Sequence, residues 1–218
     1  MPNPSPAPWP ALSDLGISAD RPLVMVDVDE VLGLFMQGFG AFVADRGYEF
    51  RVDRFALFQN IWRPGAAEHL PLAEGKLLFD DFFATGCGEI EPVPGAANAL
   101  ARLSSVAELL ILTNAPEPAR HLRADWLARH GLPTALVLNT GPKGPVAAAL
   151  AAQTSWPTAF VDDLIPNLDS VAAHSPATAT FQHVADPILR GLAPRSDDHP
   201  RIDDWAELAD AIEASIRP

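Results

Sequence analysis

Short apolar runs recur along the chain without the regular polar alternation of a half-exposed strand. They are rich in residues that favour β-structure. Such runs are typical of strands that are buried on both faces, as in a parallel sheet. We therefore predict buried strands at Leu23–Val26, Leu109–Leu112, Ala135–Leu138, Ala159–Val161 and Thr178–Phe181.

Helical patterns separate these runs, and their ends carry the expected punctuation. Proline is favoured in the first helical turn and glycine just past the last one. The predicted helices are Ala96–Leu103 after Pro94-Gly95, Ala119–His130 before Gly131, Val146–Gln153 after Pro145, and Ile202–Ile216 after a start at Asp203-Asp204. Strands that alternate with helices predict βαβ units. The expected fold class is therefore α/β, with a doubly wound parallel sheet in three layers.

One long segment interrupts this rhythm. Residues 31–91 lie between the first strand and the next βα unit, and they contain most of the phenylalanines. Their pattern predicts helices at Leu34–Arg46, Val52–Trp62 and Leu77–Ala84. An insertion of this length is better explained by a small helical domain than by a loop. We expect residues 31–91 to form that domain, and residues 21–30 and 92–218 to form the core domain.

Composition narrows the class of protein. The 218 residues carry a formal net charge of −13, which argues against a nucleic-acid polymer as partner but not against a small phosphorylated molecule. No apolar run approaches the roughly 20 residues of a membrane-spanning helix. The one cysteine, Cys87, cannot form an internal disulfide, which is typical of the cytoplasm. The alternating prolines of residues 1–20 predict an extended, flexible tail. The sequence does not indicate the oligomeric state.

Polar residues follow four of the predicted strands, where each strand ends. Ligands of a doubly wound sheet bind outside these carboxyl ends, so the residues are expected to meet at one edge. The polar residues in question are Asp27, Asp29, Thr113, Asn114, Lys143, Asp162, Asp163 and Asn167. Each alone has an ordinary structural explanation, such as a helix cap or a surface lysine. Their joint occurrence at one edge has none.

The chemistry of this set favours a divalent metal and a phosphoryl group. Crowded carboxylates repel one another unless a cation lies among them. Oxygen ligands without histidine or cysteine select Mg²⁺. A carboxylate, a magnesium ion, a lysine and a threonine hydroxyl together are what phosphoryl transfer requires. The sequence has neither the glycine-rich loop of P-loop nucleotide-binding proteins nor the dinucleotide fingerprint.

Four segments, LVMVDVDEVL, ILTNAP, GPKGP and FVDDLIPNL, resemble in order the four motifs of the haloacid dehalogenase (HAD) superfamily. The resemblance implies a Rossmann-like core with a cap domain inserted after the first motif, where residues 31–91 lie. It also implies a Mg²⁺-dependent phosphatase that acts on a small phosphorylated metabolite through an aspartyl-phosphate.

The resemblance assigns roles by position. Asp27 is the expected nucleophile, and Asp29 is the expected acid and base. Thr113 and the backbone N–H of Asn114 are expected to bind the phosphoryl group, and Lys143 to steady both Asp27 and the phosphate. The remaining positions are expected to serve the metal: Asp27, Asp163 and the carbonyl of Asp29 as ligands, Asp162 directly or through water, and Asn167 behind them.

Two positions refine these expectations. Asp29 is present, whereas dehalogenases of the superfamily lack it, so dehalogenation is disfavoured. Glu30 stands where the superfamily usually has glycine, threonine or another small residue, and we expect its side chain to point outward. Phosphomutases or phosphotransferases of the same fold, and a non-catalytic phosphate-binding module, remain alternatives to a phosphatase.

The cap is expected to select the substrate. The stripe Phe35, Phe39 and Phe42 predicts one packed helix face. Other cap residues are candidates for substrate contact: Phe58 and Trp62 through stacking on an aromatic leaving group such as a nucleobase, and Arg63, His69 and Lys76 through charge. Stacking on Phe58 and Trp62 would suit a nucleotidase, which is one kind of phosphatase.

Overall fold

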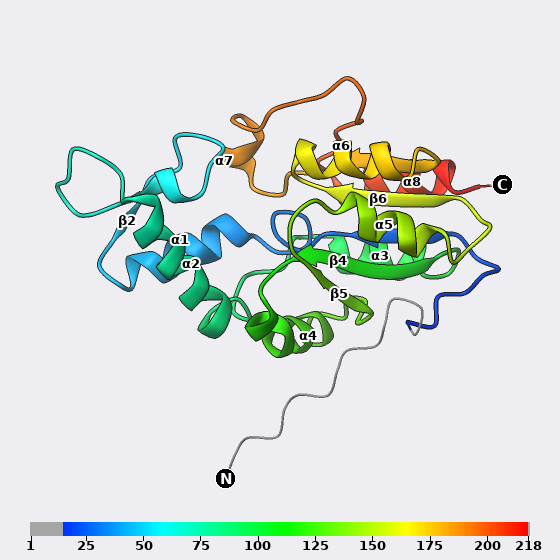
Figure 1. Cartoon of the computed structure of the whole chain (residues 1–218), viewed down its shortest axis with the longest axis horizontal. Coiled ribbons are helices and arrows are strands. Elements are labelled where there is room, and N and C mark those ends of the chain that lie inside the picture. Colours follow the sequence, from blue (N-terminus) through cyan, green and yellow to red (C-terminus); the bar gives the residue numbers. More distant parts are fainter. Residues whose placement is uncertain (1–14, 218) are drawn as a thin grey trace, which may run out of the picture.

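The computed structural model describes residues 15–217, and its core is one parallel sheet. The strands are ordered β5-β4-β1-β6-β7 (Figure 1). Their bounds are β1 Leu23–Val26, β4 Glu108–Asn114, β5 Leu136–Asn139, β6 Thr158–Asp162 and β7 Thr178–Gln182. All five predicted strands are therefore confirmed, and β1 has the predicted bounds. The central strand β1 pairs with β4 on one side and β6 on the other, and all four of its residues are completely buried.

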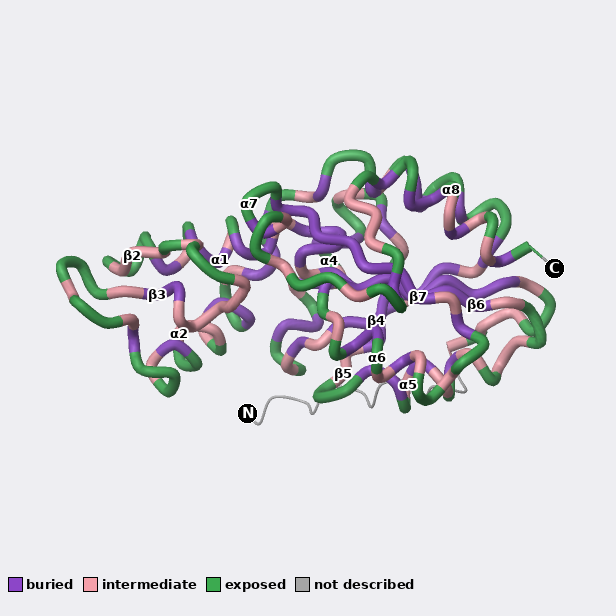
Figure 2. The backbone as a smooth tube through the Cα atoms, turned by 90° about the horizontal axis from the view of Figure 1, so that it is seen from above, coloured by how far each residue is buried: buried purple, intermediate pink, exposed green. Residues whose placement is uncertain are grey.

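Helices cover both faces of the sheet, which confirms the three-layer prediction. Figure 2 shows α8 on one side and α5 and α6 on the other. The bounds are α3 Ala96–Leu103, α4 Arg120–Arg129, α5 Gly144–Ala151, α6 Ile165–His174, α7 Pro187–Arg190 and α8 Trp205–Ser215. Alternate residues of β1 serve the two layers: Val24 and Val26 pack in the cluster that contains Trp126 and Trp205, whereas Leu23 and Met25 pack with residues of α5 and α6.

The segment between β1 and α3 projects beyond the strand ends, at the left of Figure 1. It contains two helices and a small sheet of two antiparallel strands. The bounds are α1 Phe35–Ala44, β2 Glu49–Phe50, β3 Ile61–Trp62 and α2 Leu72–Thr85. The ring of Phe82 meets those of Phe35, Phe39 and Phe42 edge-on, with centroids 5.2–5.4 Å apart. This stripe therefore joins α1 to α2, as its spacing predicts.

The helix predicted at Val52–Trp62 is wrong. This stretch is a loop with a single 3₁₀ turn, Phe58–Asn60, before β3. The buried amide of Asn60 donates hydrogen bonds to the carbonyls of Arg54 and Ala56, which holds the loop without helical bonds. Ile61 then pairs with Phe50 in the small sheet. Side-chain bonds of this kind compete with helix formation, and periodicity alone does not reveal them.

Residues 15–20, which the sequence placed in the flexible tail, pack against the core. Leu15 and Ile17 lie on the apolar cluster of the α5 and α6 layer. The carbonyl of Ala19 accepts a hydrogen bond from the hydroxyl of Thr154. The rest of that tail, up to residue 14, lies outside the described residues. Within residues 15–217, no helix has the length and apolar character needed to cross a bilayer.

Candidate active site

Three carboxylates meet at the carboxyl ends of β1 and β6. Asp27 directly follows β1, Asp162 ends β6, and Asp163 comes next. Each can offer one oxygen such that the three oxygens lie within 4.8 Å of one another. All three residues are buried. The topology explains the meeting, because β1 and β6 are neighbouring parallel strands whose ends share one edge of the sheet.

Lys143 lies beneath this cluster and is completely buried. Its Nζ is 2.8 Å from Oδ1 of Asp27 and 2.5 Å from Oδ2 of Asp162. Burial by itself lowers the pKa of Lys143, but the charges of Asp162 and Asp27 outweigh it and raise the pKa above its ordinary value. Lys143 is therefore a fixed positive charge that orients Asp27.

The lysine does not neutralise all three acids. Burial raises the pKa of Asp162 to about 6, even though Lys143 and the amide of Asn167 lower it. Burial also raises the pKa of Asp163, and the neighbouring charge of Asp162 raises it further. A further cation would favour the ionised form of these buried carboxylates. Ligands that are all oxygen atoms fit Mg²⁺. The residues present therefore fit the metal implied by the sequence.

Asn167 holds Asp162 in place. Its Nδ2 donates to both carboxylate oxygens of Asp162, at 3.0 and 3.2 Å. The backbone N–H of Leu164 donates to Oδ1 of the same group at 2.9 Å. Both carboxylate oxygens of Asp162 thus accept hydrogen bonds from Lys143, Asn167 or Leu164. Asp163 and Asp27 are therefore freer to face a cation.

Asp29 has a partner that the sequence did not suggest. Its carboxylate forms an ion pair with Arg123 of α4, a side chain that is completely buried. Burial raises the pKa of Asp29 to about 6, while the charge of Arg123 lowers it. The available signal was the position of Arg123 three residues before Trp126, on the apolar face of its helix.

Thr113 and Asn114 end β4 beside the carboxylates. Thr113 is buried, and its Oγ1 has no hydrogen-bond partner among the described residues. The side chain of Asn114 donates to the carbonyl of Gly141 at 3.0 Å and accepts from Asn139 at 2.8 Å. Asn114 therefore fixes the loop that precedes Lys143, and the Thr113 hydroxyl is free for a ligand.

Glu30 points inward, against the outward orientation expected from the sequence, and it adopts a left-handed backbone conformation. Its φ is 60°, a region that favours glycine over residues with a side chain. Its buried carboxylate accepts hydrogen bonds from the backbone N–H of Met36 at 2.7 Å and of Asp186 at 3.2 Å. Burial raises the pKa of Glu30 to about 7.

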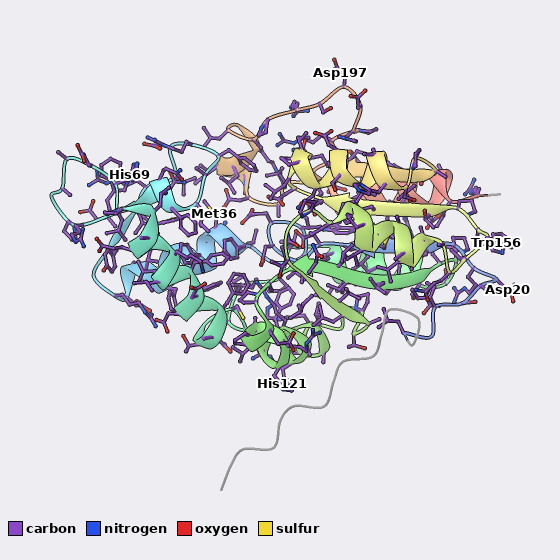
Figure 3. The ribbon with its side chains drawn as sticks, viewed as in Figure 1. Asp20, Met36, His69, His121, Trp156 and Asp197 are labelled. Carbon is purple, nitrogen blue, oxygen red and sulfur yellow. The ribbon has the colours of Figure 1, made fainter. Side chains whose placement is uncertain are left out.

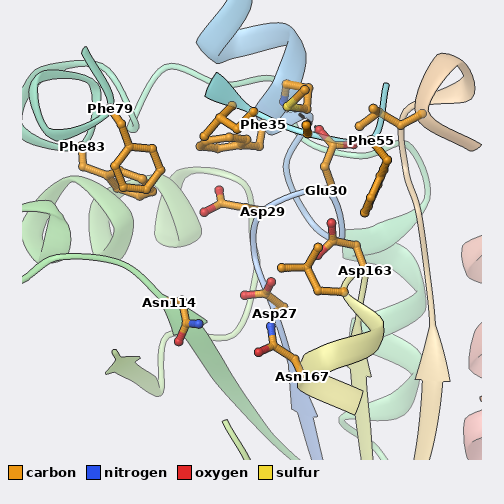
Figure 4. Close-up of a pocket in the computed structure, with 15 residues that line it drawn as sticks. Asp27, Asp29, Glu30, Phe35, Phe55, Phe79, Phe83, Asn114, Asp163 and Asn167 are labelled. Carbon is orange, nitrogen blue, oxygen red and sulfur yellow. Dashed lines mark hydrogen bonds between the residues drawn. The ribbon is translucent and has the colours of Figure 1, made fainter. Parts of the chain in front are cut away.

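A cavity of about 320 Å³ lies between the sheet edge and the inserted segment (Figure 4). The core supplies its polar lining: Asp27, Asp29, Glu30, Asn114, Asp163 and Asn167. The inserted segment supplies an apolar wall: Phe35, Met36, Phe55, Ala56, Leu57, Phe79 and Phe83. Leu164 and Leu189 complete it. Within the described chain, no lysine, arginine or histidine lines the cavity.

The structure does not bring the candidate cap contacts to this cavity. Phe58 packs edge-on against Phe79, and Trp62 lies beneath the guanidinium of Arg51. Arg63 pairs with Glu74, and Lys76 with Asp80. Figure 3 shows His69 farther from the core than Met36. These side chains interact within the inserted segment itself.

The phenylalanines that do line the cavity were counted as helix core or left unassigned. Phe79 and Phe83 are one helical turn apart on α2, so their spacing already placed them on one face. Phe55 belongs to the loop that was expected to be helical. Its position depends on that loop's fold and therefore has no periodic signal in the sequence.

The raised pKa values predict that, in EDTA, the protein is less stable at pH 8 than at pH 6. A group whose pKa is higher in the folded protein than in the unfolded chain contributes its full stability at pH values below the unfolded pKa. This contribution is lost as the pH rises through the folded pKa. For Glu30 the window runs from 4.5 to about 7, so its loss between pH 6 and 8 is about 1–2 kcal/mol. The raised pKa of Asp163 adds to this loss of stability. The lowered pKa of His183 has the opposite effect, at pH values below about 6.5.

Melting curves at the two pH values check this prediction. We expect a lower Tm at pH 8 in EDTA, and a smaller difference when Mg²⁺ neutralises the cluster. The Glu30→Gln variant is expected to lose part of the pH dependence. An equal or higher Tm at pH 8 in EDTA would contradict the electrostatics described here.

Comparison with known proteins places this fold. No family model matches the sequence, and no curated protein is significantly similar to it. Solved structures do match over nearly the whole chain. A HAD family hydrolase from Deinococcus radiodurans R1, crystallised with phosphate and sodium, superimposes with a TM-score of 0.57 at 17% identity, covering 91% of this chain and 97% of its own.

Two further structures agree. A haloacid dehalogenase-like hydrolase from Xanthomonas campestris has a TM-score of 0.59 at 12% identity, with 92% and 95% of the two chains covered. A putative β-phosphoglucomutase from Bacteroides vulgatus has a TM-score of 0.53 at 13% identity, with 92% of each covered. The protein therefore has the fold of the HAD-superfamily hydrolases, as the resemblance of its motifs indicated.

Proposed function

We propose that this protein is a Mg²⁺-dependent phosphohydrolase that cleaves a small phosphomonoester through an aspartyl-phosphate on Asp27. The observation that carries the proposal is the cluster of Asp27, Asp162 and Asp163 beside the buried Lys143, with Asp27 and Asp163 lining the cavity. This arrangement combines a nucleophile, a cation site and a fixed positive charge at the edge where such a sheet binds its ligands.

The metal site would use Asp27, Asp163 and the carbonyl oxygen of Asp29, with Asp162 direct or through water. When bound, Mg²⁺ offsets negative charge on the phosphoryl oxygens and so favours attack by an anionic carboxylate. Asn167 and Lys143 keep Asp162 oriented behind it.

The first half of the reaction transfers the phosphoryl group to the protein. A carboxylate oxygen of Asp27 attacks phosphorus in line, the bond to the ester oxygen breaks, and the leaving oxygen takes a proton from Asp29. Arg123 holds the Asp29 side chain in place for this transfer. The Thr113 hydroxyl and the Asn114 backbone N–H orient the phosphoryl oxygens, and Lys143 contributes positive charge.

The second half restores Asp27. Asp29, now ionised, takes a proton from a water molecule as that water attacks phosphorus. The bond from phosphorus to Asp27 breaks and inorganic phosphate leaves. The balance is one ester and one water consumed, and one alcohol and one phosphate formed. The apolar wall of the inserted segment acts as the cap that limits access of other water.

Phosphate release from p-nitrophenyl phosphate tests the proposal. We expect turnover with Mg²⁺, a loss of roughly 100-fold or more in EDTA, and recovery on adding Mg²⁺ back. Unchanged release in EDTA would contradict it. A phosphomutase or phosphotransferase would instead move the phosphoryl group between hydroxyls without net phosphate. A binding module would melt at a higher temperature with Mg²⁺ and beryllium fluoride but release nothing.

A further inference from the structure

We infer, on the basis of the proposed function, that the substrate is the monophosphate of a compact apolar alcohol, preferably aromatic, with no second anionic group. The cavity that joins the carboxylate cluster to the inserted segment carries this inference, because its chemistry changes sharply from one side to the other.

Every side chain that the inserted segment places in the cavity is apolar. Four are phenylalanines, and the ring of Phe79 lies 4.6 Å from that of Phe83 and tilted by 64°. Phe83, on α2, is held by ring contacts with Phe35 of α1 and with the neighbouring Phe82. A leaving group seated here meets rigid aromatic faces, which favour burial of another ring.

A leaving group rich in hydroxyls fits poorly. The polar lining is confined to the sheet edge and Glu30, where the phosphoryl group and its cation belong. Sugar hydroxyls placed against Phe55, Leu57 and Phe79 would lose their hydrogen bonds to water without replacement. Each such loss costs about 1–3 kcal/mol. Nucleotides meet the same objection through their ribose, although their base could stack.

A second negative charge fits worse. No cation lines the cavity, and the two buried cations nearby are already engaged: Lys143 by Asp27 and Asp162, and Arg123 by Asp29. Arg63 and Lys76 of the inserted segment, which were expected to bind anions, pair instead with Glu74 and Asp80. A carboxylate or second phosphate on the leaving group would therefore be buried without a partner.

Glu30 also disfavours a second anionic group on the leaving alcohol. Its carboxylate lines the cavity where the polar floor meets the apolar wall, next to Met36, to whose N–H it is bonded. The second bond, from the N–H of Asp186, fixes the other oxygen. A glycine would suit the local φ better, so the side chain is kept at the expense of backbone strain. Both of its carboxylate oxygens already accept backbone hydrogen bonds, so Glu30 gives a second anion no partner.

The size of the cavity sets the scale of the alcohol. Ligand pockets range over roughly 300–1,000 Å³, and this one, at about 320 Å³, is near the lower limit. Part of that volume holds the phosphoryl group. One ring or a short branched chain remains for the leaving alcohol.

The test compares kcat/KM for benzyl phosphate, the phosphate ester of 4-(hydroxymethyl)benzoate, and ribose 5-phosphate, with p-nitrophenyl phosphate as the reference. The first two differ by one carboxylate at the far end of the ring. We expect benzyl phosphate to exceed each of the other two by roughly tenfold or more.

A positive charge added to the apolar wall of the cavity tests whether this cavity sets the ratio of kcat/KM for the two benzyl esters. Phe55→Arg places a cation among the lining residues, and Phe55 is only half-buried. We expect this variant to lose activity on benzyl phosphate and to narrow the ratio between the two benzyl esters at least tenfold. Leu77→Arg adds the same charge at an exposed position of α2, outside the lining, and should leave the ratio unchanged.

The outcomes separate the two proposals. Absence of Mg²⁺-dependent release from p-nitrophenyl phosphate overturns the proposed function and this inference with it. Release from p-nitrophenyl phosphate together with equal or better use of the carboxylated ester or the sugar phosphate overturns the inference alone. The wild-type rates decide this point without any variant, so a Phe55→Arg protein that fails to fold does not weaken the test.

Discussion

Phosphate release should fall at least about 10⁴-fold when Asp27 is replaced by asparagine, because the amide cannot form the aspartyl-phosphate. Asp27 stands at the end of the central strand, 2.8 Å from the Nζ of Lys143 and within metal-sharing distance of Asp163. Asp162 cannot replace it, because its carboxylate is tied to Lys143 and Asn167, and Asp163 is expected to hold the metal. The measurement is steady-state release of phosphate from p-nitrophenyl phosphate with Mg²⁺.

The fold of Asp27→Asn is expected to survive. Asparagine has nearly the same shape, and Lys143 keeps Asp162 as its ion-pair partner. Circular dichroism should therefore show a cooperative melt close to that of the wild type. Asp125→Asn, the same exchange at an exposed position of α4, is the matched control and should keep full activity. A folded Asp27→Asn protein with more than a few per cent of wild-type activity would contradict the role of Asp27.

Lys143→Met is expected to destabilise the protein by about 3–5 kcal/mol in EDTA and to abolish phosphate release. Lys143 is the only cation whose ion pairs reach Asp27 and Asp162 among the described residues, and its side chain is fully buried. Methionine fills similar space but leaves three buried carboxylates facing one another. Chemical denaturation followed by fluorescence measures the loss, and the phosphate assay measures the activity.

Magnesium should recover part of this stability, because a divalent cation replaces some of the missing charge at the same oxygens. We therefore expect Mg²⁺ to raise the Tm of Lys143→Met more than that of the wild type. Lys76→Met removes an exposed lysine whose pair with Asp80 spans one helical turn, and should cost less than about 1 kcal/mol. Equal losses for the two lysines would show that the ion pairs of Lys143 do not hold the site together.

The core could be predicted because its signals are local. The run Leu23–Val26 is apolar throughout since β1 is buried on both faces, and the bounds of Ala96–Leu103 follow from the Pro94-Gly95 start. The order of polar residues along the chain then placed Asp27 and Asp162 at one edge, because parallel neighbouring strands end together.

The unpredicted features all depend on contacts between distant segments. Arg123 faces Asp29 because α4 packs beside the loop after β1, and its position on the buried face of α4 does not by itself identify this partner. The loop before β3 is held by the side chain of Asn60, so the helical pattern of Val52–Trp62 is misleading. Glu30 was expected to point outward, but the N–H groups of Met36 and Asp186 draw its carboxylate inward. These contacts also determine which residues form the cavity wall. Phe55 and Phe79 line the cavity, whereas the predicted contacts Trp62 and Arg63 do not.

The most direct test of the central claim is peptide mass spectrometry of protein that is acid-quenched within milliseconds of mixing with Mg²⁺ and saturating p-nitrophenyl phosphate. We predict a phosphoryl adduct on the peptide that contains Asp27, present during turnover, gone when substrate is exhausted, and absent from Asp27→Asn. Turnover that proceeds with the adduct on a different residue, or that continues undiminished in Asp27→Asn, would contradict an aspartyl-phosphate at Asp27.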